Sequence, residues 1–375
     1  MSNRINAFQF AALGLMLGNS LFISFGIIIL LTLSKQDAWI TMLIATLLAF
    51  IPILILIYII NFKPEKNIFE KMEVLFGKIF GKVMNFIITC YVLLMLLIII
   101  WSTTYFVLTQ YLSKVPFLFL ASLFILVAAY AVSKGIETIA RTNEIMFFIG
   151  CIFILLIIIS LQPHSEITNL KPILVKGITP LIGHAFLALS YAFPPLFTLL
   201  AIPKNNLIDN KHYHKYLIIG FLISVFFISI VFFYLITVNT IYLVELFRYP
   251  GYHVQYKIDV AGFFQGVENF LSLHWIFNTF CLIMMCLFFL SRYVKDLFKM
   301  QEGRKLNIII LVIGLIVVYV TNYLFPNSEA GVQFMKEIYP YYIASSLFGL
   351  LIIIMIVIFF NKRKQKEDQK TLLLN

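Results

Sequence analysis

Long apolar runs separated by short polar connections occupy almost the whole chain. Because a membrane-crossing helix needs about 20 apolar residues, this pattern predicts ten such helices. They cover approximately 7–33, 38–60, 83–112, 116–133, 145–161, 178–201, 216–240, 270–291, 306–324 and 338–360. The connections near Lys35, Lys114 and Lys134 are short, so we expect one packed transmembrane domain over residues 1–375. The predicted fold class is an all-α polytopic membrane protein.

Two of these runs are interrupted by small and polar residues in mid-span. The first reads LGLMLGNSLFISFG (13–26), and the sixth reads LIGHAFLALSYAFPPLF (181–197). They open two halves of five helices each, 5–161 and 178–360, and an odd number of helices per half implies inverted orientations. Broken helices at matching positions of inverted halves indicate a binding site near the membrane midplane. We therefore expect the first and sixth helices to be broken around a ligand.

Polar groups near the two interruptions are the candidate contacts. Glycine lets a backbone approach a ligand closely, and the histidine can exchange hydrogen bonds with it. Polar residues of the third and eighth helices can line the same cavity. The candidate ligand-binding residues are Gly18, Asn19, Ser20, Ser102, Tyr105, Gly183, His184 and Asn278. Helix packing is the competing interpretation, because glycine and small polar residues also bring transmembrane helices together, and a histidine can be satisfied by a neighbouring carbonyl.

Basic residues are distributed unevenly between the two sides of the predicted bundle. Seven of the 28 Lys and Arg residues fall on one side: Lys35, Lys114, Lys171, Lys176, Arg248, Lys257 and Lys336. The other 21 fall on the opposite side, which includes the basic tail 361–375. Since cytoplasmic loops carry the excess of Lys and Arg, both termini are expected in the cytoplasm. The tail can also contact acidic lipid headgroups.

Composition removes several other classes of protein. The chain is 62% hydrophobic and 12% charged, against about 25% charged in soluble domains. The charge of +11 lacks the aromatic-interleaved basic face of a nucleic-acid binder, so no nucleic-acid partner is expected. The cysteines lie inside apolar runs, and His212 and His214 lack a third metal ligand nearby. With neither a phosphate-binding glycine loop nor a nucleophile elbow, the chain is predicted to be non-enzymatic and without a cofactor.

Several strings, in this order and spacing, resemble a known family. They include INAFQFAALGLMLG (5–18), KGIETIARTNEI (134–145), LKPILVKGITPLI (170–182) and VENFLSLHWIF (267–277). The chain resembles the B subunit of spore-germination nutrient receptors, also called endospore germination permeases, of the amino acid–polyamine–organocation superfamily. The resemblance covers residues 5–360 and implies two inverted five-helix repeats of the LeuT-like kind. It also implies a spore inner-membrane receptor that binds a small nutrient, such as an amino acid, and acts with A and C subunits.

One departure from the family bears on the ligand. Relatives often carry an acidic residue after the Phe-Pro of the sixth helix, whereas this chain reads FPPLFTLL (193–200). No Asp or Glu lies deep inside any predicted span, and proton-driven transporters usually place a titratable group there. This favours a receptor that senses its ligand over the alternative, an amino-acid permease working by alternating access.

Overall fold

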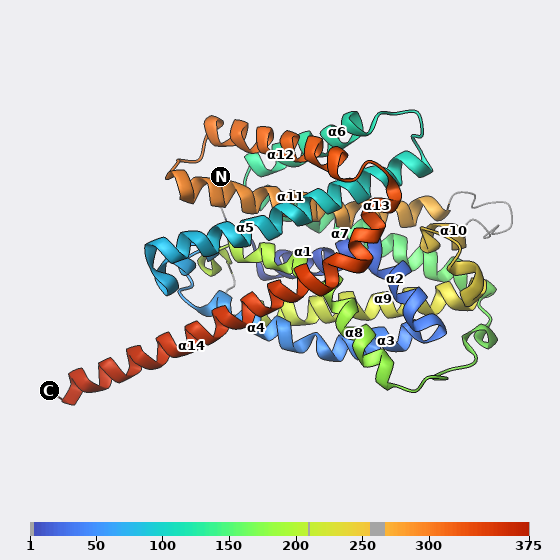
Figure 1. Cartoon of the computed structure of the whole chain (residues 1–375), viewed down its shortest axis with the longest axis horizontal. Helices are drawn as coiled ribbons and strands as arrows, with labels where there is room; N and C mark the ends of the chain where they lie inside the picture. The colour runs from blue at the N-terminus through green and yellow to red at the C-terminus, as the bar shows by residue number, and fades with distance from the viewer. Residues whose placement is uncertain (1–3, 209–210, 256–266, 375) are drawn as a thin grey trace.

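The computed structural model describes residues 4–208, 211–255 and 267–374 as an elongated bundle of helices (Figure 1). Eight segments of this described chain are long and apolar enough to cross a membrane. The longest of them, Ala7–Asn61, folds back at the tight turn Lys35–Asp37, and a shorter apolar helix covers Phe117–Ser133. Ten helical passes are therefore present in the described residues, which confirms the predicted fold class.

The first five passes use seven α-helices. Their bounds are α1 (Ala7–Leu21) with α2 (Ile27–Ser34), α3 (Ala38–Leu48) with α4 (Phe50–Asn61), α5 (Ile68–Gln110), α6 (Phe117–Ser133) and α7 (Ile136–Leu161). The five residues between α1 and α2, Phe22–Gly26, form a π-helical turn. The first pass is therefore interrupted, yet it stays helical throughout.

The last five passes also contain departures from the regular α-helix. Their bounds are α8 (Thr179–Ala192), continued by a 3-10 segment (Pro194–Ala201), α9 (Tyr213–Val244), α11 (Val267–Phe298), α12 (Arg304–Leu324) and α14 (Ser345–Leu374), which follows a π-helical segment (Phe334–Ala344). The short helices α10 (Pro250–Gln255) and α13 (Ser328–Gln333) lie in connections. The sixth pass thus changes from α to 3-10 geometry at its paired prolines, because proline cannot donate the α-helical hydrogen bond.

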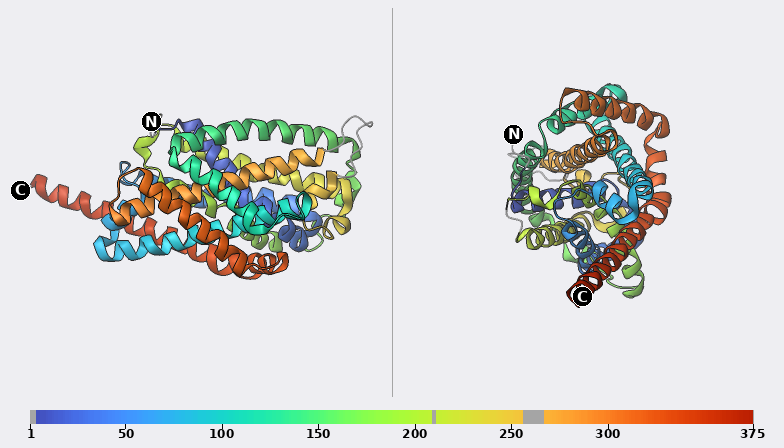
Figure 2. Two further views of the ribbon diagram at one scale, coloured as in Figure 1. Left: turned by 90° about the horizontal axis from the view of Figure 1, so that it is seen from above. Right: turned by 90° about the vertical axis from the view of Figure 1, so that its left-hand side faces the viewer.

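Burial separates a core from a rim. About 83% of the apolar stretch is buried in both Asn269–Phe298 and Thr179–Ala201, against 17% in Ile136–His164. The end-on view shows α11 (orange) inside the bundle (Figure 2), where it packs on α1, α5, α6 and α7. The rim helices turn large apolar side chains outward, as expected for surfaces that face lipid.

Local signals explain where α5 begins. Asn67 caps it by accepting from the Glu70 amide at 3.0 Å, and the Glu70 carboxylate accepts from the Asn67 amide in return. Gly77 then takes a positive φ of 78°, which allows a turn within the helix. The third pass therefore starts well before the predicted residue 83.

One end of the bundle is fastened by hydrogen bonds between distant segments. We call it the basic end, because it holds Arg4 and the basic half of α14. There the Ile5 amide donates to the Asn206 carbonyl at 3.0 Å, and the Ile208 amide donates to the Ile5 carbonyl at 2.9 Å. These bonds tie the start of the first pass to the connection after the sixth.

The opposite end, which we call the Lys35 end, carries the α2–α3 and α5–α6 turns together with α10 (Figure 1). Both ends of the described chain lie at the basic end. The two predicted groups of basic residues are thus separated by the bundle, although Lys257 lies outside the described residues. That the basic end faces the cytoplasm stays a prediction.

Candidate functional site

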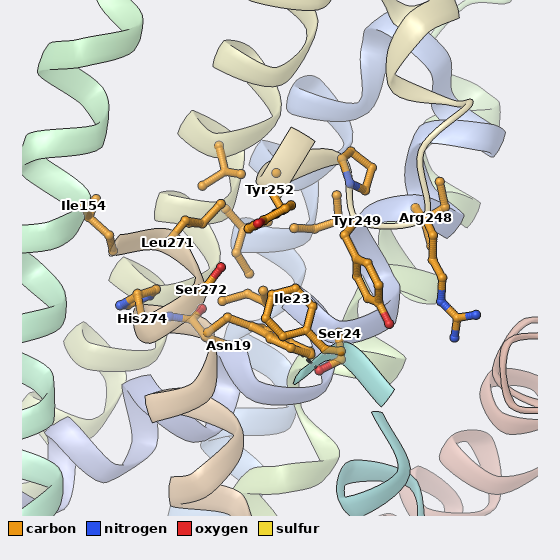
Figure 3. A pocket seen from close by; sticks show the side chains of 18 of the residues that line it. Asn19, Ile23, Ser24, Ile154, Arg248, Tyr249, Tyr252, Leu271, Ser272 and His274 are labelled. Atoms are coloured by element: carbon orange, nitrogen blue, oxygen red, sulfur yellow. Dashed lines mark hydrogen bonds between the residues drawn. The ribbon is translucent and has the colours of Figure 1, made fainter. Parts of the chain in front are cut away.

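A cavity of about 80 Å³ lies beside the π-helical turn of the first pass (Figure 3). Its walls come from the first pass and from α5, α7, α9, α10 and α11. Most of the lining is apolar, including Ile23, Val231 and Trp275, with a few polar groups among it. Small-molecule sites have this composition, an apolar wall with a small number of placed polar groups.

Side-chain hydrogen bonds accompany the π-helical turn. The Ser20 hydroxyl donates to the Leu17 carbonyl at 2.7 Å, and the Ser24 hydroxyl donates to the Ser20 carbonyl at 2.9 Å. Such bonds to the preceding turn bend helices. The Trp275 indole of α11 then donates to the Ser24 hydroxyl at 3.1 Å. The turn is thus held partly by its own serines and partly by a residue far away in the sequence, and π-turns are frequent at functional sites.

Asn19 is fixed at the inner wall of the cavity. Its side-chain oxygen accepts from the Ser224 hydroxyl of α9 at 2.8 Å. That bond occupies the acceptor, so the amide nitrogen is the group that remains to donate. Figure 3 shows the Asn19 amide next to His274.

The tautomer of His274 can be inferred from its neighbour. The Asn278 side-chain nitrogen donates to the His274 carbonyl at 2.7 Å, which fixes the amide orientation. The same nitrogen lies 3.0 Å from His274 Nε2, so Nε2 must accept. A neutral ring then carries its proton on Nδ1, and Nδ1 has no acceptor among the described residues.

Aromatic rings and one arginine close the cavity at the Lys35 end. Phe106 meets Trp275 edge-on at 3.9 Å between ring centroids and Tyr249 at 4.9 Å. The Arg248 guanidinium lies 5.5 Å from the Tyr249 ring. Burial raises the pKa of the Tyr249 phenol, and the neighbouring Arg248 charge opposes that shift. The phenol therefore stays protonated near neutral pH.

Comparison with known proteins places the chain in a family. The sequence profile described as "Spore germination protein" matches residues 4–326. The chain belongs to this spore germination protein family. Spore germination protein KB of Bacillus subtilis is 26% identical over 296 residues, 77% of each chain. Spore germination protein YndE of the same organism is 25% identical over 321 residues, 84% of this chain and 85% of YndE. The resemblance seen in the sequence is confirmed.

The fold is shared with a transporter of known structure. A Na⁺-coupled sialic acid symporter, in a substrate-bound and outward-open state, superposes with a TM-score of 0.64 over 95% of this chain and 89% of the symporter. The sequence identity is 14%, so the similarity concerns the fold alone. It confirms a LeuT-like arrangement for this member of the spore germination family.

The predicted ligand-binding residues of the first pass have different surroundings. Asn19 lines the cavity, whereas Gly18 packs against α9, where an added Cβ would lie 2.8 Å from Ser224 Oγ. Ser20 is fully buried and bonded within its own helix. In this structure Gly18 contributes to helix packing and Ser20 to the shape of the turn, and their ligand roles stay predictions. Only Asn19 of the three faces the cavity.

The candidates on the third and eighth passes lie next to the cavity without lining it. Asn278 supports His274 from one turn away. Tyr105 donates to the Pro326 carbonyl at 2.9 Å and its ring centroid lies 5.3 Å from that of Phe117, and Ser102 is buried. Their ligand roles stay predictions, and their visible contacts join helices.

Gly183 and His184 belong to a different groove. This second groove, of about 730 Å³, lies between α8, the second pass and the tenth pass. His184 Nδ1 lies 2.8 Å from the Ser34 hydroxyl, which also accepts from Thr41 at 3.0 Å. The structure thus does not bring these two residues together with Asn19, contrary to the expectation of one shared cavity. The separation arises because the 3-10 segment of the sixth pass, not its Gly-His pair, is buried in the core.

Sequence reasoning missed the residues that close the cavity. Arg248, Tyr249 and α10 fall in 241–270, an aromatic-rich stretch without clear periodicity, of which 256–266 lie outside the described residues. One feature of the sequence could have indicated Arg248: it is the single arginine among the seven basic residues on the less basic side of the predicted bundle.

Proposed function

We propose that this protein is the membrane subunit of a spore germinant receptor, which binds a small nutrient such as an amino acid and signals to partner subunits. The observation that carries the proposal is the cavity beside the π-helical turn, where Asn19 and a few other polar groups offer hydrogen bonds inside a mainly apolar wall. Membership of the spore germination family supports the biological setting. Germinant receptor A and C subunits are the proposed partners.

The cavity is suited to linking a ligand to helix movement. Its lining belongs to several passes and to the connection between α9 and α11. A ligand shifts a conformational equilibrium only by its difference in affinity between the two states. A nutrient that touches the first pass and α11 at once would favour the state in which these helices are close. Partner subunits would then detect the altered position of the helices at the membrane surface.

A cytoplasmic contact for a partner is proposed at the start of α7. Arg141 donates to Glu137 at 2.7 Å on the exposed face, and Glu144 accepts from Gln9 of α1 at 2.8 Å. The second bond joins α7 to the first pass, which carries the π-helical turn. Movement of the first pass would therefore shift the start of α7 and, with it, the exposed Glu137–Arg141 pair.

The binding step is tested by blocking the cavity. Val231 lines it from α9, so Val231→Phe should fill space that a ligand needs. Ile223→Phe is the matched control, because Ile223 lies on the same helix, is 40% exposed and does not line the cavity. Purified wild-type protein is screened by thermal shift against the common L-amino acids. We expect Val231→Phe to remove the stabilisation and Ile223→Phe to retain it; equal behaviour of the two variants would place the site elsewhere.

A transport assay distinguishes the receptor from the alternative function, an amino-acid permease. The symporter fold supports it at the level of architecture only. Wild-type protein is reconstituted alone into proteoliposomes with the labelled amino acid that gives the largest thermal shift. We expect binding without gradient-driven accumulation. Accumulation above the external concentration would establish the permease instead.

A further inference from the structure

Arg248 is held at the rim of the cavity by aromatic rings. Its guanidinium carbon lies 5.5 Å from the Trp101 ring centroid and 5.5 Å from that of Tyr249. In Figure 3 it lies on the opposite side of the cavity from His274. Guanidinium groups stack on aromatic faces through their flat surface. One edge of the guanidinium hydrogen-bonds the Tyr249 phenol, and such stacking leaves the other N–H groups available to an acceptor.

The rings beneath Arg248 are themselves fixed. Trp101 is buried and stacks on Phe25 of the π-helical turn, with centroids 5.7 Å apart and planes 6° from parallel. Gly331 of α13 covers the same ring so closely that an added Cβ would overlap it. The arginine is therefore positioned by a rigid surface, which reduces the entropy lost when it binds an anion.

No protein carboxylate neutralises Arg248 within the described part of the chain. Glu245, three residues earlier, is already bound by Lys35, whose Nζ lies 2.7 Å from one carboxylate oxygen and within reach of the other. Neither Asp nor Glu lines the cavity among the described residues. A half-buried guanidinium without a counter-ion favours an anionic ligand, and a planar carboxylate fits its fork with two parallel hydrogen bonds.

From these contacts, we propose that Arg248 binds the carboxylate of the nutrient at the mouth of the cavity and so selects ligands that carry this group. The proposal rests on the proposed function and adds to it the residue that recognises the acid. The apolar wall behind Arg248 would take the side chain of the ligand. Amines and amides of the same shape would enter without this contact and bind more weakly.

The test compares each amino acid with its own primary amide. Dissociation constants are measured by thermal shift for L-alanine, L-valine and L-leucine and for their amides, on wild-type protein, Arg248→Gln and Arg248→Lys. A charge-assisted hydrogen-bond pair corresponds to a loss of about 10- to 100-fold. We expect wild-type protein to prefer the acid by that factor and Arg248→Gln to lose the preference. Arg248→Lys should keep part of it, since the charge remains while the planar fork is lost.

The matched control is Lys114→Gln, which removes an exposed positive charge from the same end of the bundle. It should leave the acid-to-amide ratio unchanged. If Arg248→Gln weakens acid and amide equally, or changes neither, the function stands and the role of Arg248 is refuted. If the wild-type protein binds none of the six compounds or any other L-amino acid, the proposed function itself fails, and the carboxylate role with it.

Discussion

Gly18→Ala is the substitution that best separates a packing role from a ligand role in the first pass. An added Cβ would lie 2.8 Å from Ser224 Oγ and 3.1 Å from two carbons of the Phe221 ring. Both neighbours are fully buried on α9, so neither can move into open space. Gly183→Ala is the matched control: Gly183 also lies within a helix, and nothing is found within 4 Å of its added Cβ.

The expected magnitude follows from three contributions. Overpacking costs about 1–3 kcal/mol, and displacement of Ser224 weakens its bond to Asn19, which is worth about 0.6 kcal/mol in a membrane setting. Replacing glycine by alanine inside a helix stabilises the folded protein by about 1 kcal/mol, because alanine has the higher helix propensity. Gly18→Ala should therefore destabilise the protein by about 0.6–2.6 kcal/mol. Gly183→Ala receives only the favourable contribution and should be neutral or slightly stabilising.

The assay uses the buried thiols as reporters of unfolding. Cys281 and Cys286 are completely buried on α11, so a thiol-reactive fluorophore labels them only when the bundle opens. At about 2–3 °C per kcal/mol for a chain of this size, Gly18→Ala should lower the apparent Tm by about 1–8 °C. Adding Ser224→Ala, which removes the nearest atom, should restore part of that loss. Equal melting of Gly18→Ala and Gly183→Ala would refute the packing interpretation of Gly18.

Three further predictions concern polar groups outside the cavity. Glu245→Gln should lower stability by no more than about 1 kcal/mol, because the Lys35 partner is half exposed, and the difference should vanish when thermal unfolding is repeated in high salt. His184→Ala should leave the affinity for the best amino acid unchanged in thermal-shift titrations, since His184 faces the second groove; a fall in affinity would give that groove a binding role. Glu302 is partly buried, which alone would raise the pKa of its carboxyl, but hydrogen bonds from two basic side chains of α11 outweigh this and lower the pKa to about 2. Its stabilising contribution is therefore complete above about pH 4.5 and lost as the pH falls toward 2, so the Tm difference between wild type and Glu302→Gln should shrink over that range.

The number of passes could be predicted from the sequence because hydropathy and span length determine it. The boundaries were less predictable where charges occur inside a helix. The fifth pass was expected from 145, but α7 starts at Ile136, because Glu137 and Arg141 pair one turn apart on an exposed face. Likewise, the lysines of 71–82 moved the predicted start of the third pass to residue 83, whereas α5 includes them on either side of Gly77.

The candidate site was only partly predictable, since its shape depends on contacts between distant residues. Asn19 could be found because a lone amide inside an apolar run needs a partner. The π-helical turn beside it involves a hydrogen bond from Trp275, about 250 residues away along the chain, and no local pattern encodes that contact. Gly183 shows the same limit of local patterns. Like Gly18, it precedes a polar residue inside an apolar run, but it lines the second groove and not the cavity.

The two ends of the bundle are held by bonds of different kinds, which bears on the choice between receptor and permease. At the basic end, the first pass is joined to the connection after the sixth by two backbone hydrogen bonds, each worth about 0.5–1.5 kcal/mol. At the Lys35 end, the cavity is closed by aromatic contacts and by Arg248, and the exposed Lys35–Glu245 pair lies outside the cavity lining. Opening the mouth of the cavity therefore separates side-chain contacts, because the backbone bond of this end from the Glu166 amide to the Thr237 carbonyl at 3.0 Å lies away from the cavity lining. Opening the basic end must break paired backbone. This difference agrees with the proposed receptor, in which a ligand is bound and released at one end of the bundle.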